Sequence, residues 1–324
     1  MPVMLIGGNG FIGSHLAERL RAMGQAVTVL DPGPPRADVD WRGINYRRAA
    51  WTDADVLDVA LQDCDTVVHL ASSTVPSTGN ADPSFDVQSN LIGALSLIDA
   101  MKRRGRKRIV FFSSGGTVYG NPDHLPVEES HALRPICSYG IVKAAIENYL
   151  LMYGQSGELA PLILRPSNPY GPRQSIAGAQ GFIAAVMARL RNGQALDIWG
   201  DGGHVRDYLY IDDLVELASR AIVSDVCGVF NAGSGIGRTL NEVRAVVEQV
   251  ARQPVHVRSL PARPFDVRSI VLDVAAARAR FDWSPKVGID EGVACMWQWL
   301  EVQGHADRVD VGPDIAGASE RNNQ

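Results

Sequence analysis

Short apolar runs alternate with longer amphipathic stretches along most of the chain. The runs at 4–6, 26–30, 66–70, 108–112, 162–164 and 228–231 have the length and continuous hydrophobicity of strands that are buried on both faces. The stretches between them, such as 14–23 and 90–104, have the character of helices. This alternation predicts an α/β fold in which helices cover both faces of a doubly wound parallel sheet.

The pattern changes after Pro166, where we expect a second domain to begin. We assign 1–166 to the first domain and 167–303 mainly to a smaller, intercalated C-terminal domain, with returns to the first domain near 204–232. In the second part we expect a helix at 182–191, a strand that enters a Gly-Asp-Gly-Gly turn within 196–203 and, at 239–242, the capping box of another helix. The stretch 304–324 is polar and without periodicity, so we expect a flexible tail.

Length and charge narrow the class of protein. The chain has 324 residues, of which 46% are hydrophobic, so it can bury a sizeable core. Its formal net charge of −5 argues against a generally basic surface for nucleic acid. No apolar run approaches the roughly 18 residues that a membrane span needs. We therefore expect neither nucleic acid nor membrane as a partner.

One basic run, at 102–108, needs its own explanation. It falls where a predicted helix ends and a predicted strand begins. Cations complement the dipole at the end of a helix, and Gly105 suits the left-handed residue that follows. We therefore interpret the run as a helix terminus and keep a nucleic-acid patch as the alternative.

Cysteine and histidine usage indicates a reducing compartment and no metal. The four cysteines are widely separated without a CxxC pair, and no histidine has the spacing of a zinc site. The first residues lack the basic start of a secretory signal. We expect free thiols and a cytoplasmic protein.

Glycines crowd the turn between the first strand and the first helix. Gly7, Gly10 and Gly13 form GxxGxxG, while Gly8 with the last two forms GxGxxG. Bare backbone at a helix N-terminus attracts a pyrophosphate. Asp31, 18 residues beyond Gly13, ends the next strand and can accept hydrogen bonds from an adenosine ribose. Because its charge repels a 2′-phosphate, the pattern favours NAD over NADP. A tight turn with glycines for packing alone is the other interpretation.

A tyrosine and a lysine four residues apart form the main catalytic candidate. Tyr139 and Lys143 share one face of a predicted helix. Lowering a phenol pKa from about 10 to about 7 takes about 4 kcal/mol. A cation about 4 Å away, at an effective dielectric of about 20, supplies a comparable amount. The pair therefore suits a base that removes a proton from a hydroxyl, although the same spacing is also common on surface helices.

Hydroxyls and glycines follow the strand at 108–112. They are Ser113, Ser114, Gly115, Gly116 and Thr117. The carboxyl edge of a parallel strand is where open α/β sheets bind ligands. We therefore expect this segment to join the glycine loop and the Tyr–Lys pair in one site.

Together these motifs resemble the extended branch of the short-chain dehydrogenase/reductase superfamily. More narrowly, the chain is similar to the NAD-dependent epimerase/dehydratase family, and within it to the UDP-glucose 4-epimerases and related nucleotide-sugar epimerases. The resemblance covers about residues 1–300 and rests on GGNGFIG at 7–13, HLAS at 69–72, SSGGTVYG at 113–120, SYGIVK at 138–143, RPSNPYGP at 165–172, GDGGHVRDYLYIDD at 200–213, FNAGSG at 230–235 and PARPFDV at 261–267.

The resemblance implies an NAD site and a catalytic pair. The residues implied around the cofactor are Gly7, Gly10, Phe11, Ile12 and Gly13 at the pyrophosphate, Asp31 at the adenosine ribose, Leu70, Ala71 and Ser72 along the cofactor, Asn90 beneath it and Ser113 beside the nicotinamide. Tyr139 is implied as the catalytic base, and Lys143 as its partner on the nicotinamide ribose.

The resemblance also implies a sugar-nucleotide site. The residues implied there are Asn168, Arg206 and Arg263 at the diphosphate, Trp199 near uracil and Asp266 at the nucleotide ribose. A homodimer formed through the helices that carry Asn90 and Tyr139 is implied as well.

One position departs from the family pattern. Gly115 stands where the family has its usual catalytic serine or threonine. Alternate residues of an extended chain share a face, so Thr117 or Ser113 can offer the missing hydroxyl. We take Thr117 as the catalytic and substrate-binding candidate. The strand end also lacks the acid that dehydratase and decarboxylase relatives carry, which argues against both reactions.

We therefore expect an NAD-dependent nucleotide-sugar 4-epimerase that acts on a UDP-hexose through a transient 4-keto sugar, with Tyr139 as base. A nucleotide-sugar oxidoreductase of the same fold and a non-catalytic dinucleotide-sensing regulator are the alternatives. The intact Tyr139 and Lys143 count against the regulator.

Overall fold

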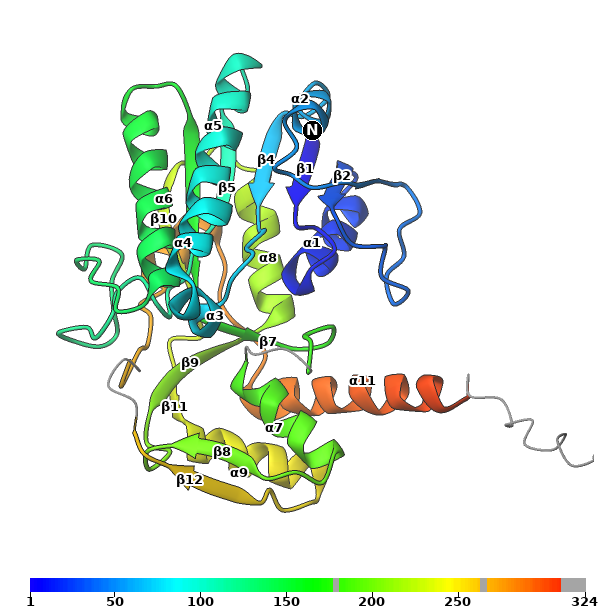
Figure 1. Cartoon of the computed structure of the whole chain (residues 1–324), viewed down its shortest axis with the longest axis vertical. Helices are drawn as coiled ribbons and strands as arrows, with labels where there is room; N and C mark the ends of the chain where they lie inside the picture. The colour runs from blue at the N-terminus through cyan, green and yellow to red at the C-terminus, as the bar shows by residue number, and fades with distance from the viewer. Residues whose placement is uncertain (177–180, 263–266, 310–324) are drawn as a thin grey trace, which may run out of the picture.

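A parallel sheet of seven strands organises the N-terminal part of the computed structural model, which describes residues 1–176, 181–262 and 267–309 (Figure 1). The strand order is β10-β6-β5-β4-β1-β2-β3, and every neighbouring pair is parallel. The strands are β1 (Pro2–Ile6), β2 (Ala26–Asp31), β3 (Ile44–Arg48), β4 (Thr66–His69), β5 (Arg108–Phe112), β6 (Ala160–Pro166) and β10 (Gly228–Ala232). The predicted doubly wound fold is confirmed.

Alternate side chains of these strands enter two separate cores. Val3 and Leu5 of β1 pack with the helices α1 (Phe11–Ala22) and α8 (Ile211–Ile222). Met4 and Ile6 of the same strand enter the opposite core with α2 (Ala54–Ala60), α5 (Gly93–Arg103) and α6 (Ser138–Gln155). Because successive strand residues point to opposite faces, continuous apolar strands are what a sheet covered on both sides requires.

The helix expected at 90–104 is longer and less regular than its sequence pattern indicates. Two short helices, α3 (Pro76–Ala81) and α4 (Pro83–Asp86), lead into a π-helical turn, η1 (Val87–Ile92), before α5 begins at Gly93. A side chain at Gly93 would collide with the ring of Trp51. Such π-helical turns are rare and often lie at functional sites.

Most of the remaining elements lie beyond the carboxyl ends of the parallel strands (Figure 1). They are β7 (Asn168–Tyr170), β9 (Val205–Tyr210) and β11 (Gly237–Thr239) in one sheet, β8 (Leu196–Trp199) and β12 (Val257–Leu260) in another, and the helices α7 (Phe182–Arg191), α9 (Leu240–Ala251) and α11 (Ile289–Val309). The helix α10 (Ala275–Phe281) instead packs against β10 and α8.

Three local expectations for this second part have different outcomes. The capping box is confirmed, since Thr239 Oγ1 accepts from Glu242 N over 3.1 Å and Glu242 Oε2 accepts from Thr239 N over 2.7 Å. The strand expected within 196–203 runs from Leu196 to Trp199 and then enters the expected glycine turn, in which Gly200 and Gly202 adopt positive φ angles of 82° and 74°. The helix α11 continues past the tail boundary expected at 304, and residues 310–324 lie outside the described ranges.

The basic run at 102–108 is a helix terminus, as predicted. The helix α5 ends at Arg103, and Gly105 has a φ of +64°. Lys102 pairs with Glu158 over 2.6 Å, and Arg104 pairs with Asp58. Arg108 caps carbonyls near the end of α8, including that of Ala221 over 3.1 Å. These cations are used within the fold. Among the described residues, no helix is long and apolar enough to cross a membrane.

Candidate active site

A cavity of about 540 Å³ opens at the carboxyl edge of the parallel sheet. Its walls come from the glycine loop, the segments that follow β4 and β5, the first turns of α6 and the segment around β7, with Arg206 and Val267 from the second part. Open α/β sheets bind their ligands at this edge. The three sequence motifs expected in one site therefore share one cavity.

The glycine loop fits a pyrophosphate in the GxxGxxG register. Gly7 has a φ of +81°, and a Cβ there would lie 2.9 Å from the backbone of Ala71. A Cβ at Gly13 would lie 2.5 Å from the carbonyl oxygen of Gly7. Gly8 faces Val29 instead and does not line the cavity. The cavity is lined here by Gly7, Gly10, Phe11, Ile12 and Gly13.

The first helix begins three residues earlier than the apolar pattern indicates, at Phe11 rather than Ser14. Gly10 is its N-cap and provides no side-chain hydrogen bond to the helix terminus. The first amides of α1 are therefore free of a side-chain cap, and the helix dipole is positive at this end. An anionic group in the cavity can therefore accept hydrogen bonds from these amides.

Asp31 ends β2 and is held by backbone amides. Its Oδ2 accepts from Asn9 N over 3.2 Å, and its Oδ1 accepts from Gly33 N over 2.9 Å. The side chain of Asn9 donates to Pro34 O over 2.8 Å and accepts from Arg36 N over 3.0 Å. These bonds fix the loop after β2 against the glycine loop, and they leave Asp31 beside the cavity rather than in its lining.

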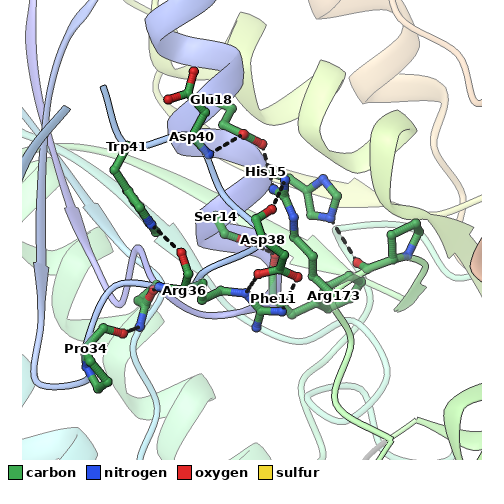
Figure 2. Close-up of polar contacts among 12 residues, drawn as sticks. Phe11, Ser14, His15, Glu18, Pro34, Arg36, Asp38, Asp40, Trp41 and Arg173 are labelled. Atoms are coloured by element: carbon green, nitrogen blue, oxygen red, sulfur yellow. Dashed lines mark hydrogen bonds and ion pairs between the residues drawn. The ribbon is translucent and has the colours of Figure 1, made fainter. Parts of the chain in front are cut away.

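The loop after β2 is also tied to the second part of the chain, as Figure 2 shows. Arg36 forms a two-point ion pair with Asp38 over 2.8 and 2.9 Å, which lowers the pKa of that carboxyl. Arg173, which follows β7, donates to Glu18 Oε2 over 2.7 Å and to Asp38 O over 3.0 Å. The guanidinium of Arg36 is therefore engaged by a carboxylate rather than free to receive a 2′-phosphate.

The segment after β4 contributes unequally to the cavity. Leu70 and Ser72 line it, while Ala71 packs against Gly7. Asn90 is buried behind this segment: its Oδ1 accepts from Ser73 N over 2.9 Å, and its Nδ2 donates to Thr74 Oγ1 over 3.0 Å. Asn90 holds the segment in place and does not itself line the cavity.

Tyr139 and Lys143 both line the cavity, one turn apart on α6. The Lys143 side chain is only 4% exposed; its Nζ donates to Phe112 O over 2.9 Å and lies 5.5 Å from the centre of the Tyr139 ring. Burial lowers the pKa of Lys143 to about 8, against the opposing charges of Glu147 and Asp86. Burial also raises the pKa of Tyr139 above its usual value.

These pKa directions correct one part of the sequence argument. We expected the lysine to lower the phenol pKa, yet burial raises it, and the charges of Cys137 and Asp86 act in the same direction. The ammonium is moreover engaged by a backbone carbonyl. Tyr139 therefore needs a further positive charge in the cavity before it can act as a base near neutral pH.

Gly115 cannot carry the family's hydroxyl in this fold. A Cβ at this position would lie 2.6 Å from Leu272 Cδ1 and 2.8 Å from the carbonyl oxygen of Arg165. The glycine is a packing requirement at the point where β5, β6 and the segment near 272 meet.

The two substitute hydroxyls differ in availability. Ser113 lines the cavity, but its Oγ donates to Glu147, which is buried in an ion pair with Arg165 at 2.6 Å. Thr117 also lines the cavity, and its Oγ1 is buried without a hydrogen-bond partner among the described residues. Since buried hydroxyls are rarely left unpaired, Thr117 is the better candidate of the two to bind a ligand. Ser167, which follows β6, also lines the cavity with a buried Oγ that has no partner among the described residues.

The residues implied for the sugar nucleotide are only partly brought together. Asn168 and Arg206 line the cavity, with Asn168 Nδ2 donating to Asp207 O over 2.9 Å and Arg206 Nη1 to Val205 O over 2.9 Å. Trp199 is half-buried at the end of β8 and does not line the cavity. Arg263 and Asp266 lie outside the described residues.

Sequence reasoning missed several lining residues from loops and element ends. They are Thr74, Val75, Pro76, Ser77, Asn80, Ile136, Cys137, Gln174 and Val267. No periodic pattern or motif marks such positions in one sequence. Within the described ranges, no group of three or more His, Cys, Asp or Glu could hold a metal ion, and the four cysteines are free.

A dinucleotide loop and a Tyr–Lys pair that face one cavity define an enzyme site of the short-chain dehydrogenase type. The model of the NAD dependent epimerase/dehydratase family matches residues 3–233, and the chain belongs to this family. The family resemblance found in the sequence is thereby confirmed.

Individual relatives are similar over nearly the whole chain. The UDP-glucose 4-epimerase of Mycolicibacterium smegmatis is 33% identical over 302 residues, which cover 91% of this chain and 96% of the relative. A solved structure of the Thermus thermophilus UDP-glucose 4-epimerase in complex with NAD has a TM-score of 0.87 at 35% identity, covering 93% of this chain and 99% of that one. A Thermotoga maritima UDP-glucose 4-epimerase solved with UDP-glucose has a TM-score of 0.86 at 32% identity, covering 94% and 99%.

Proposed function

We propose that this protein is an NAD-dependent nucleotide-sugar 4-epimerase that acts on a UDP-hexose. The observation that carries the proposal is the placement of Tyr139 and Lys143 in the same cavity as the glycine loop. The relatives named UDP-glucose 4-epimerase, two of them solved with NAD or UDP-glucose, support it. The four free thiols suit the cytoplasm, where we propose that it works.

The cradle for NAD consists of residues that fit the group. Gly7 and Gly13 have no room for a Cβ atom, and Gly10 leaves the first amides of α1 without a side-chain cap. Asp31 offers acceptors for the adenosine ribose, and Lys143 lies where the nicotinamide ribose is expected. When bound, NAD supplies the acceptor for hydride from C4, and its positive nicotinamide ring supplies charge beside the phenol. This charge is what Tyr139 lacks in the chain alone.

The chain's own residues then move the proton of the sugar 4-hydroxyl. Tyr139 accepts this proton as C4 is oxidised and returns it when C4 is reduced on its other face. Lys143 keeps a cation next to the phenol, and Thr117 offers its free hydroxyl to the same oxygen. The sugar turns within the cavity between the two transfers.

The sugar nucleotide is held on the opposite wall of the cavity. We propose that Asn168 and Arg206 bind the diphosphate, because both line the cavity and both carry side-chain N–H donors. Arg263 is proposed for the same group, Trp199 for uracil and Asp266 for the nucleotide ribose, on the family resemblance alone. Firm binding of the nucleotide lets the hexose rotate without leaving the site.

We propose a homodimer formed through α4, η1 and α6. These elements contact one another and carry exposed apolar side chains: Phe85 on α4, Val87 and Ile92 on η1, and Ile141, Tyr149 and Met152 on α6. The three on α6 recur at helical spacing, on the side opposite to Lys143. Exposed apolar side chains that gather into a patch are typical of protein–protein interfaces.

The experiment that tests the function is incubation with a panel of UDP-hexoses without added nicotinamide nucleotide, followed by NMR. We expect the 4-epimer of at least one sugar to form. Tyr139→Phe should lower the rate by about 10²–10⁴-fold while the protein still folds and binds NAD. An oxidoreductase would turn over only with stoichiometric NAD or NADH, and a regulator would not turn over. Activity of Tyr139→Phe within a few-fold of the unmodified protein contradicts the assigned base.

A further inference from the structure

A fully buried carboxylate lies next to the catalytic pair and has no part in the reaction as described. Asp86, the last residue of α4, is 0% exposed. Its Oδ1 accepts from Thr74 Oγ1 over 2.7 Å and from Asn90 Nδ2 over 2.9 Å, and its Oδ2 accepts from Ser138 Oγ over 2.7 Å. All three partners are neutral, whereas buried carboxylates are usually paired with cations.

These bonds join the segments that build the cavity wall. Thr74 lines the cavity, and Ser138 is the first residue of α6, directly before Tyr139. Gly79 of α3 makes room for the contact, since a Cβ there would lie 2.6 Å from Asp86 Oδ2 and 3.4 Å from Tyr139 N. The carboxylate also lies at the N-terminus of α6, where the helix dipole favours a negative charge.

The other titratable groups that face Tyr139 and Lys143 carry no uncompensated negative charge. Cys137 has its pKa raised by burial, and His69 is neutral because burial lowers its pKa to about 3. Glu147 has a cation partner, Arg165, in a buried ion pair, although its charge still favours the protonated form of Lys143. The elements α3 and η1, which pack against α6, contribute no titratable side chain. Among these titratable side chains, Asp86 is thus the carboxylate that has only neutral hydrogen-bond partners.

We propose that Asp86 is a positioning residue: its buried carboxylate locks the N-terminal turn of α6, which carries Tyr139, to the segment after β4. The inference rests on the proposed function, since it assigns a role in the reaction of that site. A negative charge near an ammonium stabilises its charged form, and near a phenol it opposes ionisation. Burial is the main cause of the raised pKa of Tyr139, and the charges of Cys137 and Asp86 add to it. Burial lowers the pKa of Lys143 to about 8, and the charges of Glu147 and Asp86 oppose that shift. The lysine stays cationic despite its burial, and the phenol releases its proton only once a cation occupies the cavity.

The test is the pH profile of kcat/KM for Asp86→Asn, which keeps the shape of the side chain and removes its charge. We expect both limbs of the bell to move to lower pH by about 0.5–1 unit, because Tyr139 and Lys143 both lose proton affinity. Thr74→Val is the matched control, since it removes one hydrogen bond to Asp86 and keeps the charge. It is expected to change the rate without moving the limbs.

A second readout needs no substrate. The ultraviolet titration of Tyr139, taken as the difference between each protein and its Tyr139→Phe form, should move to lower pH in Asp86→Asn. If wild-type protein fails to epimerise any sugar, the proposed function fails while this titration still tests Asp86. Unchanged limbs and an unchanged titration, or movement to higher pH, overturn the proposal.

A folding failure is also decisive. If Asp86→Asn does not fold, Asp86→Ser removes the charge with a smaller side chain, and the same acidward movement is expected. If neither variant yields folded protein at any pH, Asp86 serves folding alone and the proposal is wrong.

Discussion

Arg173 donates to Glu18 across 2.7 Å and thereby joins the segment after β7 to the first helix of the dinucleotide-binding part. Its second contact, to Asp38 O over 3.0 Å, reaches the loop that follows Asp31 (Figure 2). Arg173 adopts a positive φ of 69°, which few residues other than glycine do. The wall that carries Asn168 is therefore fastened to the expected adenosine side of the site.

Removing this link should destabilise the fold. Arg173→Met leaves the partly buried Glu18 without its cation, and we expect a loss of about 1–3 kcal/mol in the free energy of unfolding, measured by urea titration. Arg42→Met is the control, because Arg42 is 90% exposed in its pair with Asp40 and should contribute little. Equal stability of the two variants would show that the Arg173 link does not stabilise the fold.

Thr117 should be the hydroxyl that assists Tyr139. Thr117→Val keeps the shape of a half-buried side chain whose Oγ1 is buried and has no partner among the described residues, so folding should be preserved. We expect kcat to fall roughly tenfold or more with unchanged NAD affinity, because the lost hydrogen bond is made chiefly in the transition state.

The matched control on the same wall is Ser113→Ala, whose hydroxyl is already committed to Glu147. Its kcat should fall less than that of Thr117→Val. A full-rate Thr117→Val with a crippled Ser113→Ala would move the role to Ser113. Full rates in both would mean that Tyr139 works without a hydroxyl from this strand end.

Asp31 should set the preference for NAD. Asp31→Ala removes both the acceptors for a ribose and the charge that repels a 2′-phosphate, so NAD should bind more weakly and the bias against NADP should relax. Titration of each nucleotide, followed by intrinsic fluorescence, measures the change. Equal affinity of the unmodified protein for NAD and NADP would refute this role.

The buried lysine should leave a signature in the pH dependence of stability. The pKa of Lys143 is lowered from 10.5 to about 8 in the folded protein, so between these values the unfolded chain binds the proton more strongly and rising pH favours the folded state. From pH 8 to pH 9 the folded state should gain about 1 kcal/mol from this group.

Lys143→Met isolates that contribution, because other groups titrate in both proteins. One of them, Cys64, has its pKa raised to about 11 by burial and favours the unfolded state above pH 9. Both proteins are measured without cofactor. From pH 8 to pH 9 the unfolding free energy of the wild type should rise by about 1 kcal/mol relative to that of the variant. A constant difference would contradict the lowered pKa.

The sequence was sufficient for the fold and for the motifs whose spacing is local. The apolar runs predicted the strands of the sheet within a few residues, except β3, whose sequence INYRR is largely polar. The start of α1 was misplaced because Gly10 and Gly13, which disfavour helices, serve here as a cap and as a point of close approach.

What the sequence could not supply depends on contacts between distant segments. The need for glycine at 115 arises from Leu272, more than a hundred residues away. Likewise Asp86 resembles any polar residue of an exposed helix until Ser138 and Thr74 are placed around it. The pKa of Tyr139 was expected to fall because the pair was considered without the burial of its ring.

The most direct measurement of the central claim uses a UDP-hexose that carries deuterium at C4. A tightly held cofactor should accept that deuterium and return it within one cavity, while Tyr139 takes only the proton of the 4-hydroxyl. NMR should therefore show the 4-epimer with the deuterium retained at C4 and no keto sugar in solution. Loss of the deuterium to solvent, or release of a 4-keto sugar in proportion to added NAD, would contradict the proposed epimerase.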